Sequence, residues 1–199
     1  VINIPKPNNT AYTADALRNH TDLPYFEYAP GYQFLHCLIN NANGGLSSVV
    51  DGFAVANYLK KNEKDVFNIL AKTHVKFKDT DYTQKAIRIL HSPIITLTKD
   101  DDFNDIRFSM AAMGAIDVEP KNMKKFYDAY QYFASLLQNK KFKIDFRLEA
   151  GDIFCFNNRR VLHGRTEFDP NSGNRHLQGY YIERDEIIGR LNYFNNIKV

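Results

Sequence analysis

Short apolar runs, each bounded by Gly, Pro, Asn or Asp, recur along this chain, and two longer stretches carry apolar residues at helical spacing. Short runs bounded in this way are typical of β-strands. The sequence predicts strands over 10–13, 33–38, 48–50, 75–77, 94–97, 106–108, 143–148, 153–156, 161–163 and 176–183. Asn43-Gly44-Gly45 predicts a tight turn between the second and the third of these runs.

Two helical insertions interrupt the predicted strands. Asp51 suits an N-cap position, and the helical pattern over 53–72 that follows it can break at Asn62. Pro120 suits the first turn of the second insertion, because its missing N–H would have no partner there. A short helix is expected over 185–191. The residues expected on the buried face of the helix after Pro120 are Phe126, Tyr130, Phe133 and Leu137. This pattern predicts a mainly β fold with helical insertions, a sandwich or jelly-roll barrel.

The composition fits a single domain over 1–199 and excludes several classes of protein. Of the 199 residues 44% are hydrophobic, which is enough for a core, and the net charge is +3. The basic residues are scattered, so we expect no nucleic-acid partner. No apolar run approaches the roughly 20 residues of a membrane span, so we expect no membrane association. Cys37 and Cys155 are too few for a disulfide framework and fit a reducing compartment.

His20, Asp22 and His163 are candidates for a metal site. In an extended segment His20 and Asp22 lie on one face, because strand side chains alternate. Two imidazoles and one carboxylate are the ligand set of non-haem Fe(II) oxygenases. Spacing alone leaves open that each is an ordinary core or surface residue. Arg175 follows His163 by twelve residues, and its planar guanidinium suits the carboxylate of a co-substrate, although a solvated surface arginine is the alternative.

Six segments together resemble one family of enzymes. They are NNTAYT at 8–13, HTD at 20–22, PGYQFLHC at 30–37, GGLSSVVDGF at 44–53, VLHGR at 161–165 and RHLQGYY at 175–181. In this order they are similar to the γ-butyrobetaine/trimethyllysine dioxygenase family of Fe(II)/2-oxoglutarate-dependent oxygenases, which is related to taurine dioxygenase. The resemblance covers nearly the whole chain, and only the set of motifs is specific.

The resemblance implies a double-stranded β-helix, the jelly-roll core of 2-oxoglutarate oxygenases. It implies Fe(II) held by His20, Asp22 and His163, with 2-oxoglutarate and O2 as co-substrates and ascorbate as an activator. The other implied site residues are Arg175 and Ser47 for 2-oxoglutarate, and Tyr12, Tyr181 and Asn9 for the trimethylammonium group of the substrate. Aromatic faces suit a quaternary ammonium, because this cation has no N–H to donate.

Three functions follow as alternatives. The resemblance implies hydroxylation of γ-butyrobetaine to L-carnitine by a cytoplasmic enzyme, and it leaves a homodimer open. Hydroxylation of trimethyllysine by a mitochondrial enzyme is the nearest alternative, and a jelly-roll domain that binds a ligand without turnover is the third. Departures from the family pattern at Leu23, Ser109, Asn157 and Arg159 bear on the substrate. The family also has an upstream segment, which we expect residues 1–199 to lack.

Overall fold

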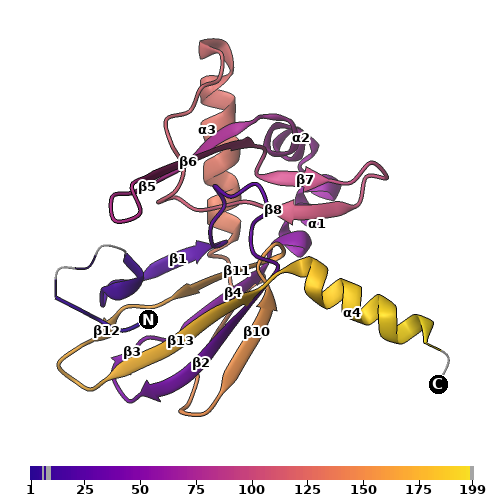
Figure 1. The fold of residues 1–199 in the computed structure, drawn as a ribbon. Helices are drawn as coiled ribbons and strands as arrows, with labels where there is room; N and C mark the ends of the chain where they lie inside the picture. Colours follow the sequence, from indigo (N-terminus) through magenta and orange to yellow (C-terminus); the bar gives the residue numbers. More distant parts are fainter. Residues whose placement is uncertain (6, 8–9, 198–199) are drawn as a thin grey trace.

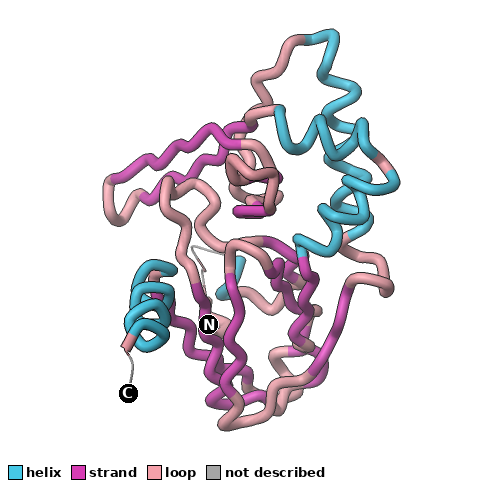
Figure 2. Tube along the Cα trace, turned by 90° about the vertical axis from the view of Figure 1, so that its right-hand side faces the viewer, coloured by secondary structure: helices cyan, strands magenta, loops and turns pink. Residues whose placement is uncertain are grey.

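The computed structural model describes residues 1–5, 7 and 10–197, with the two main sheets at one end and most helices at the other (Figure 1). Helices α1 (Gly52–Asn62), α2 (Lys64–Lys72) and α3 (Pro120–Leu136) lie beyond one end of these sheets. Helix α4 (Arg184–Asn196) extends away from the body in Figure 1. Figure 2, turned by 90°, shows α4 nearly end-on, beside the strands, and the other long helices beyond one end of the sheets. None of the described helices has the length and apolar character needed to cross a membrane.

Two antiparallel sheets form the β-rich part. The first has four strands in the order β1 (Leu17–His20), β11 (Val161–Arg165), β4 (Ser47–Asp51) and β9 (Lys143–Phe146). The second has three strands in the order β10 (Ile153–Asn157), β2 (Tyr32–Asn40) and β13 (Arg175–Ile182). The remaining strands pair as β3 (Asn43–Gly44) with β12 (Phe168–Asp169), β5 (Val75–Asp81) with β6 (Ala86–Ser92), and β7 (Ile95–Leu97) with β8 (Phe103–Ile106).

Strand β11 shows how the alternation of side chains divides the molecule. Leu162 is buried in the hydrophobic cluster that includes the helices, and it pairs in register with Val50 of β4. His163 follows Leu162, so it points to the opposite face of the first sheet, where it pairs with His20 of β1. The ring of Phe156 from β10 lies 4.9 Å from the ring of His163. The two candidate histidines therefore lie between the two sheets.

Most of the hydrophobic core lies between the helices and the first sheet. The residues predicted on the buried face of α3 and just after it are all buried, namely Phe126, Tyr130, Phe133 and Leu137. Between the sheets the buried hydrophobic cluster is small, with Cys37, Leu148 and Leu177. The space between the sheets is therefore available to polar side chains.

The predicted mainly β, jelly-roll class is confirmed, and so are both helical insertions. Asp51 caps α1, because its Oδ1 accepts hydrogen bonds from the backbone N–H groups of Phe53 at 3.0 Å and Ala54 at 3.3 Å. The predicted break at Asn62 is where α1 ends. The predicted short helix over 185–191 is longer and covers Arg184–Asn196.

Some predicted strands are wrong or displaced. Residues Thr10–Tyr12 form a turn of 3-10 helix, closed by a hydrogen bond from the N–H of Thr13 to the carbonyl of Thr10 at 3.1 Å. The strand predicted over 106–108 lies at Phe103–Ile106. Strand β1 was not predicted because Leu17 is its only large apolar residue.

The tight turn predicted at Asn43-Gly44-Gly45 is wrong, because Asn43–Gly44 forms the short strand β3 and pairs with β12. Gly44 and Gly45 have φ values of 83° and 66°, which glycine adopts without strain. The strands before and after this segment, β2 and β4, belong to different sheets. The segment therefore carries the chain from the second sheet to the first.

Candidate metal and co-substrate site

Three side chains from separate segments converge between the sheets. His20 ends β1, Asp22 lies in the turn that follows, and His163 is in the middle of β11. Nε2 of His20 lies 3.2 Å from Oδ1 of Asp22, and Nε2 of His163 lies 3.7 Å from Oδ2. The ligand atoms of these residues all lie within 4.8 Å of one another. Within the described residues they form the only group of three or more His, Cys, Asp or Glu side chains that could hold a metal ion.

The orientation of both imidazole rings is fixed by their neighbours. The rings of His20 and His163 have centroids 4.5 Å apart, because these residues pair in register. Nδ1 of His20 donates to the carbonyl of Arg18 at 2.8 Å, which leaves Nε2 to face Asp22. Nδ1 of His163 is buried and has no hydrogen-bond partner among the described residues, so packing against Phe156 and His20 sets the direction of this ring.

The charges of the three residues are strongly interdependent. Burial opposes ionisation of Asp22, but the charge of His163 and the hydrogen bond from His20 outweigh it and hold the pKa of Asp22 far below its usual range. Burial also opposes protonation of His20, but its hydrogen bond to Asp22 raises the pKa of His20 above its ordinary value. Burial lowers the pKa of His163 to about 4 despite the charge of Asp22. As the pH falls, His20 therefore takes up a proton before His163 does.

The turn that carries Asp22 is held by buried polar side chains. Asn158 is 1% exposed, and its Oδ1 accepts from the N–H of Asp22 at 2.8 Å. Its amide nitrogen donates to the carbonyls of Asp22 at 3.1 Å and Pro30 at 3.2 Å. Leu23 has a φ of 53°, in the left-handed region that a branched side chain rarely adopts. Arg107 donates three hydrogen bonds to carbonyls of the loop that follows, so the surrounding structure holds this strained turn in place.

Arg175 is a buried cation at the start of β13, with 6% of its surface exposed. Its Nε donates to the carbonyl of Gly45 at 3.3 Å, and its guanidinium carbon lies 5.8 Å from the ring centroid of Phe168. Burial lowers the pKa of Arg175 to about 10, and the charge of Arg165 adds to this, so the group stays charged at neutral pH. No carboxylate of the described residues forms an ion pair with it. A buried, unpaired guanidinium suits an anionic ligand.

Ser47 lies on the same face of the first sheet as His163 and is 6% exposed. It pairs in register with Arg165, whose guanidinium lies 5.2 Å from the same Phe168 ring that Arg175 contacts. The structure therefore brings Ser47 to the Arg175 end of the space between the sheets. Its contact with 2-oxoglutarate stays a prediction.

Two of the three predicted substrate residues lie in the described part of the chain. Tyr181 is on β13, and its hydroxyl donates to Oδ2 of Asp22 at 2.6 Å. Burial and the charge of Asp22 raise the pKa of Tyr181, and the hydroxyls of Tyr25 and Tyr12 contribute to this, so both lie near Tyr181. Tyr12 is half-buried. Asn9 lies outside the described residues.

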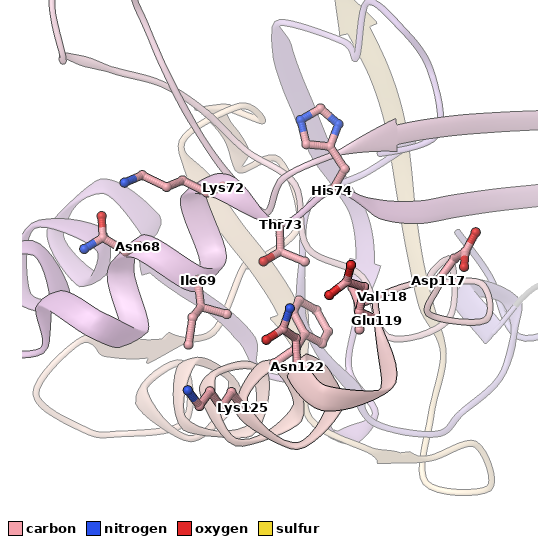
Figure 3. A pocket seen from close by; sticks show the side chains of 11 residues that line it. Asn68, Ile69, Lys72, Thr73, His74, Asp117, Val118, Glu119, Asn122 and Lys125 are labelled. Atoms are coloured by element: carbon pink, nitrogen blue, oxygen red, sulfur yellow. The ribbon is translucent and has the colours of Figure 1, made fainter.

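A separate groove lies between α2 and α3 (Figure 3). Asn68 and Lys72 of α2 and Asn122 and Lys125 of α3 line it. These four side chains are exposed, and none of the lining residues belongs to the predicted site. The groove therefore adds nothing to the candidate site.

The residues present fit an iron(II) ion and a keto-acid anion. Two imidazoles and one carboxylate on one side of a metal leave the other positions open, as in the non-haem Fe(II) oxygenases. His20 and His163 direct Nε2 toward the carboxylate of Asp22 from two neighbouring strands. Arg175 supplies the buried positive charge that the far carboxylate of a keto-acid requires.

Sequence reasoning missed three residues of this site: Asn158, Tyr25 and Phe168. Asn158 lies in the loop between β10 and β11, in a run of polar residues that gives no sign of a contact with Asp22. Its role depends on two segments that are far apart in the sequence. Phe168 lies in the two-residue strand β12, which is too short for a periodic signal. Tyr25 could have been predicted from the sequence, because it is a tyrosine three residues after the His20-Thr21-Asp22 motif.

Two facing antiparallel sheets with a His-x-Asp pair and a distant histidine between them define a double-stranded β-helix protein with a facial triad of metal ligands. The family model described as "Taurine catabolism dioxygenase TauD, TfdA family" matches residues 3–181. The chain belongs to this family.

Curated relatives and solved structures extend this assignment. The chain is 41% identical over 184 residues to gamma-butyrobetaine dioxygenase of Pseudomonas sp. (strain AK-1), covering 92% of this chain and 48% of the relative. It is 31% identical over 191 residues to trimethyllysine dioxygenase of Meyerozyma guilliermondii, covering 94% and 47%. The chain thus spans about half the length of the curated relatives it matches. Asparagine oxygenase, solved with Fe(II), hydroxyasparagine and succinate, has a TM-score of 0.73 at 19% identity over 92% of this chain and 55% of that one, a likeness of fold.

Proposed function

We propose that this chain is the catalytic part of an Fe(II)/2-oxoglutarate-dependent dioxygenase that hydroxylates γ-butyrobetaine to L-carnitine. The observation that carries the proposal is the cluster of His20, Asp22 and His163, in a chain 41% identical to a gamma-butyrobetaine dioxygenase. Ligand binding without turnover is a weaker reading, because a charged cluster of this kind is costly to bury unless it has a use.

The metal end of the site follows from the chain's own residues. His20, Asp22 and His163 would hold the iron through two nitrogens and a carboxylate oxygen. With 2-oxoglutarate and O2 the bound iron supplies the oxidising power that turns a C–H bond into C–OH, as 2-oxoglutarate becomes succinate and CO2. Below its raised pKa, His20 must lose a proton before Nε2 can bind the metal, whereas the pKa of His163, about 4, leaves that ring neutral at neutral pH. Ascorbate would keep the iron reduced.

The co-substrate end is assigned to Arg175 and Ser47. The guanidinium of Arg175 would bind the far carboxylate of 2-oxoglutarate and so gain the anionic partner that the described residues do not provide. Ser47 would donate its hydroxyl to the same carboxylate. The burial of both side chains supports this, because a charge-assisted hydrogen bond is stronger away from water.

The substrate end is assigned to Tyr12, Tyr181 and Asn9, which would surround the trimethylammonium group. Each ring that faces the cation would contribute about 0.5–2 kcal/mol. The position of Tyr181 beside Asp22 supports this assignment, because a substrate held there has its reacting carbon close to the metal ligands. We therefore propose a small quaternary-ammonium molecule as the substrate. We also propose that the enzyme is cytoplasmic.

The test is succinate formation from 2-oxoglutarate by this chain with Fe(II), ascorbate and O2. γ-Butyrobetaine and trimethyllysine are supplied separately, and the hydroxylated product is identified by mass spectrometry. We expect stimulation by γ-butyrobetaine with production of L-carnitine. Stimulation by trimethyllysine alone would replace the substrate and would favour a mitochondrial location. No stimulation by either compound, with iron bound, would refute the proposed substrate class.

A further inference from the structure

The hydroxyl of Tyr181 touches one of the three predicted metal ligands directly. It donates to Oδ2 of Asp22 at 2.6 Å, a distance typical of a charge-assisted hydrogen bond from a hydroxyl to a carboxylate. The other oxygen, Oδ1, faces Nε2 of His20 at 3.2 Å. The two oxygens of Asp22 therefore have different surroundings: Oδ1 faces His20, whereas Oδ2 accepts from Tyr181 and lies 3.7 Å from Nε2 of His163.

The backbone holds this arrangement from both sides. Tyr181 pairs in register with Gln33 of the central strand β2, so its position along the second sheet is fixed. The peptide of Asp22 is held by Asn158 through both its N–H and its carbonyl. With both backbones fixed, the carboxylate has little freedom to rotate away from the phenol. Oδ1 is the oxygen directed toward His20, and it is the oxygen without a hydrogen bond from Tyr181.

We propose that Tyr181 is a positioning residue whose hydroxyl holds Oδ2 of Asp22, so that Asp22 binds the metal through one oxygen only. This inference rests on the metal site of the proposed function. A phenol that donates to one carboxylate oxygen occupies one of its two lone pairs and draws electron density from it, so this oxygen is the weaker metal ligand of the two. The same side chain would then serve two ends of the site, with its ring toward the substrate and its hydroxyl on the metal carboxylate.

The number of carboxylate oxygens on the metal decides how many positions stay open. A six-coordinate ion with two histidines and one oxygen of Asp22 has three positions left, and a chelating keto-acid fills two of them. If both oxygens of Asp22 bound the metal, the keto-acid would fill the last two positions. Tyr181 thus preserves the one position that a third reactant requires.

The test compares Tyr181→Phe with Tyr180→Phe in the whole chain. Tyr180 is the matched control, because it is 43% exposed, close to the 42% of Tyr181, but lies on the opposite face of β13, stacked on Phe34. Both variants are loaded with Co(II), whose visible absorption reports the number and geometry of its ligands. Co(II) affinity and the spectrum with and without 2-oxoglutarate are measured on these samples. Succinate formation is measured separately, with Fe(II), ascorbate and O2.

We expect Tyr181→Phe to change the Co(II) spectrum, both alone and with 2-oxoglutarate, while the Co(II) affinity stays within about 3-fold and succinate formation falls roughly 10- to 100-fold. Tyr180→Phe should match the unaltered chain in every measurement. A Tyr181→Phe spectrum identical to that of the unaltered chain would overturn the inference. If γ-butyrobetaine fails to stimulate succinate formation while the spectrum changes as expected, the proposed substrate is wrong and the role of Tyr181 stands. If the unaltered chain binds no Co(II), both are wrong.

Discussion

Asp22 and Arg175 both carry a charge between the two sheets, but their surroundings differ. The carboxylate of Asp22 has His20, His163 and the hydroxyl of Tyr181 around it, so its negative charge is compensated within the chain. Among the described residues the guanidinium of Arg175 has one hydrogen-bond partner, the carbonyl of Gly45, and the nearby charge of Arg165 repels it.

The comparison with Arg165 shows that this difference is not a general property of buried arginines. Arg165 donates to three backbone carbonyls, those of Ala11, Thr13 and Asp15, so its charge is compensated by the segment that precedes β1. Arg175 lies against the same Phe168 ring but has a single carbonyl partner, Gly45. Arg165 is therefore fixed by the chain's own backbone, whereas Arg175 has fewer partners among the described residues, which supports the anion-binding role proposed for it. The side chains proposed to bind the metal already lie together, whereas the partner proposed for Arg175 comes from outside the chain.

The largest effect is expected from removing a metal ligand. His163→Ala should weaken Fe(II) and Co(II) binding by more than the roughly 10- to 100-fold that loss of an outer partner costs, and should abolish succinate formation. Isothermal titration with Co(II) measures this. His91→Ala, a change at an exposed histidine of β6, is the control and should leave binding unaltered. Normal metal affinity in His163→Ala would remove this residue from the site.

Removing the uncompensated cation should affect the other end alone. Arg175→Ala should weaken 2-oxoglutarate binding about 10- to 150-fold, because a hydrogen bond to a charged group contributes roughly 1.5–3 kcal/mol. Co(II) affinity should stay unchanged, since Arg175 contacts none of the metal ligands. Arg190→Ala in α4, where the side chain is exposed, serves as the control. Equal 2-oxoglutarate affinity in Arg175→Ala and the unaltered chain would contradict the assignment.

The fold was largely predictable because it follows from local patterns. The apolar spacing of α3 and the N-cap at Asp51 need no knowledge of distant residues, and both are confirmed. Strand β1 was missed for the opposite reason, because a short polar segment becomes a strand only by pairing with β11. The 3-10 turn at Thr10–Tyr12 likewise replaced a predicted strand.

The candidate site was predictable in its residue types but not in its contacts. The motifs pointed to His20, Asp22 and His163, and the structure brings these three together. No pattern in the sequence pointed to Asn158 as the clamp on the turn of Asp22, because the two residues are 136 positions apart. The same holds for Tyr181, which was predicted for its ring but contacts Asp22 through its hydroxyl.

A smaller effect on metal affinity is expected from changing Asn158, which holds the turn of Asp22 in place. Asn158→Ala removes the side chain that accepts one hydrogen bond from the backbone near Asp22 and donates two to it. Co(II) affinity should therefore fall roughly 10-fold. The free energy of unfolding should also fall by about 1–3 kcal/mol, because buried backbone groups lose their partners. Asn122→Ala on the exposed surface of α3 is the control. Titration with Co(II) and urea unfolding are the measurements; a loss of stability with full metal affinity would mean that Asn158 does not act on Asp22.

Lowering the pH should also affect the two ends of the site differently: metal affinity should fall, whereas 2-oxoglutarate affinity should hardly change. The pKa of His20 is raised above its ordinary value, so its Nε2 keeps a proton that a metal must displace, and metal affinity should fall about 10-fold per pH unit below this pKa. The pKa of His163, about 4, means that a second proton competes only in more acidic solution. Arg175 stays charged below its pKa of about 10, so 2-oxoglutarate binding by the metal-free chain should hardly change between about pH 5.5 and 8. In Co(II) titrations below the pKa of His20, the plot of log affinity against pH should have a slope of one, for one displaced proton. A slope of two in this range would mean that a second group of the site is protonated there, which would contradict the low pKa of His163.

The smallest effect concerns the ring that both arginines share. Phe168→Leu keeps an apolar side chain but removes the aromatic face, which contributes about 0.5–2 kcal/mol to a nearby cation. Arg165 retains its three carbonyl partners, whereas Arg175 loses one of the few groups that position it. We therefore expect 2-oxoglutarate affinity to fall about 2- to 5-fold with Co(II) affinity unchanged. If metal affinity fell as well, the ring would act through Arg165 and the segment before β1, and the two ends of the site would not be independent.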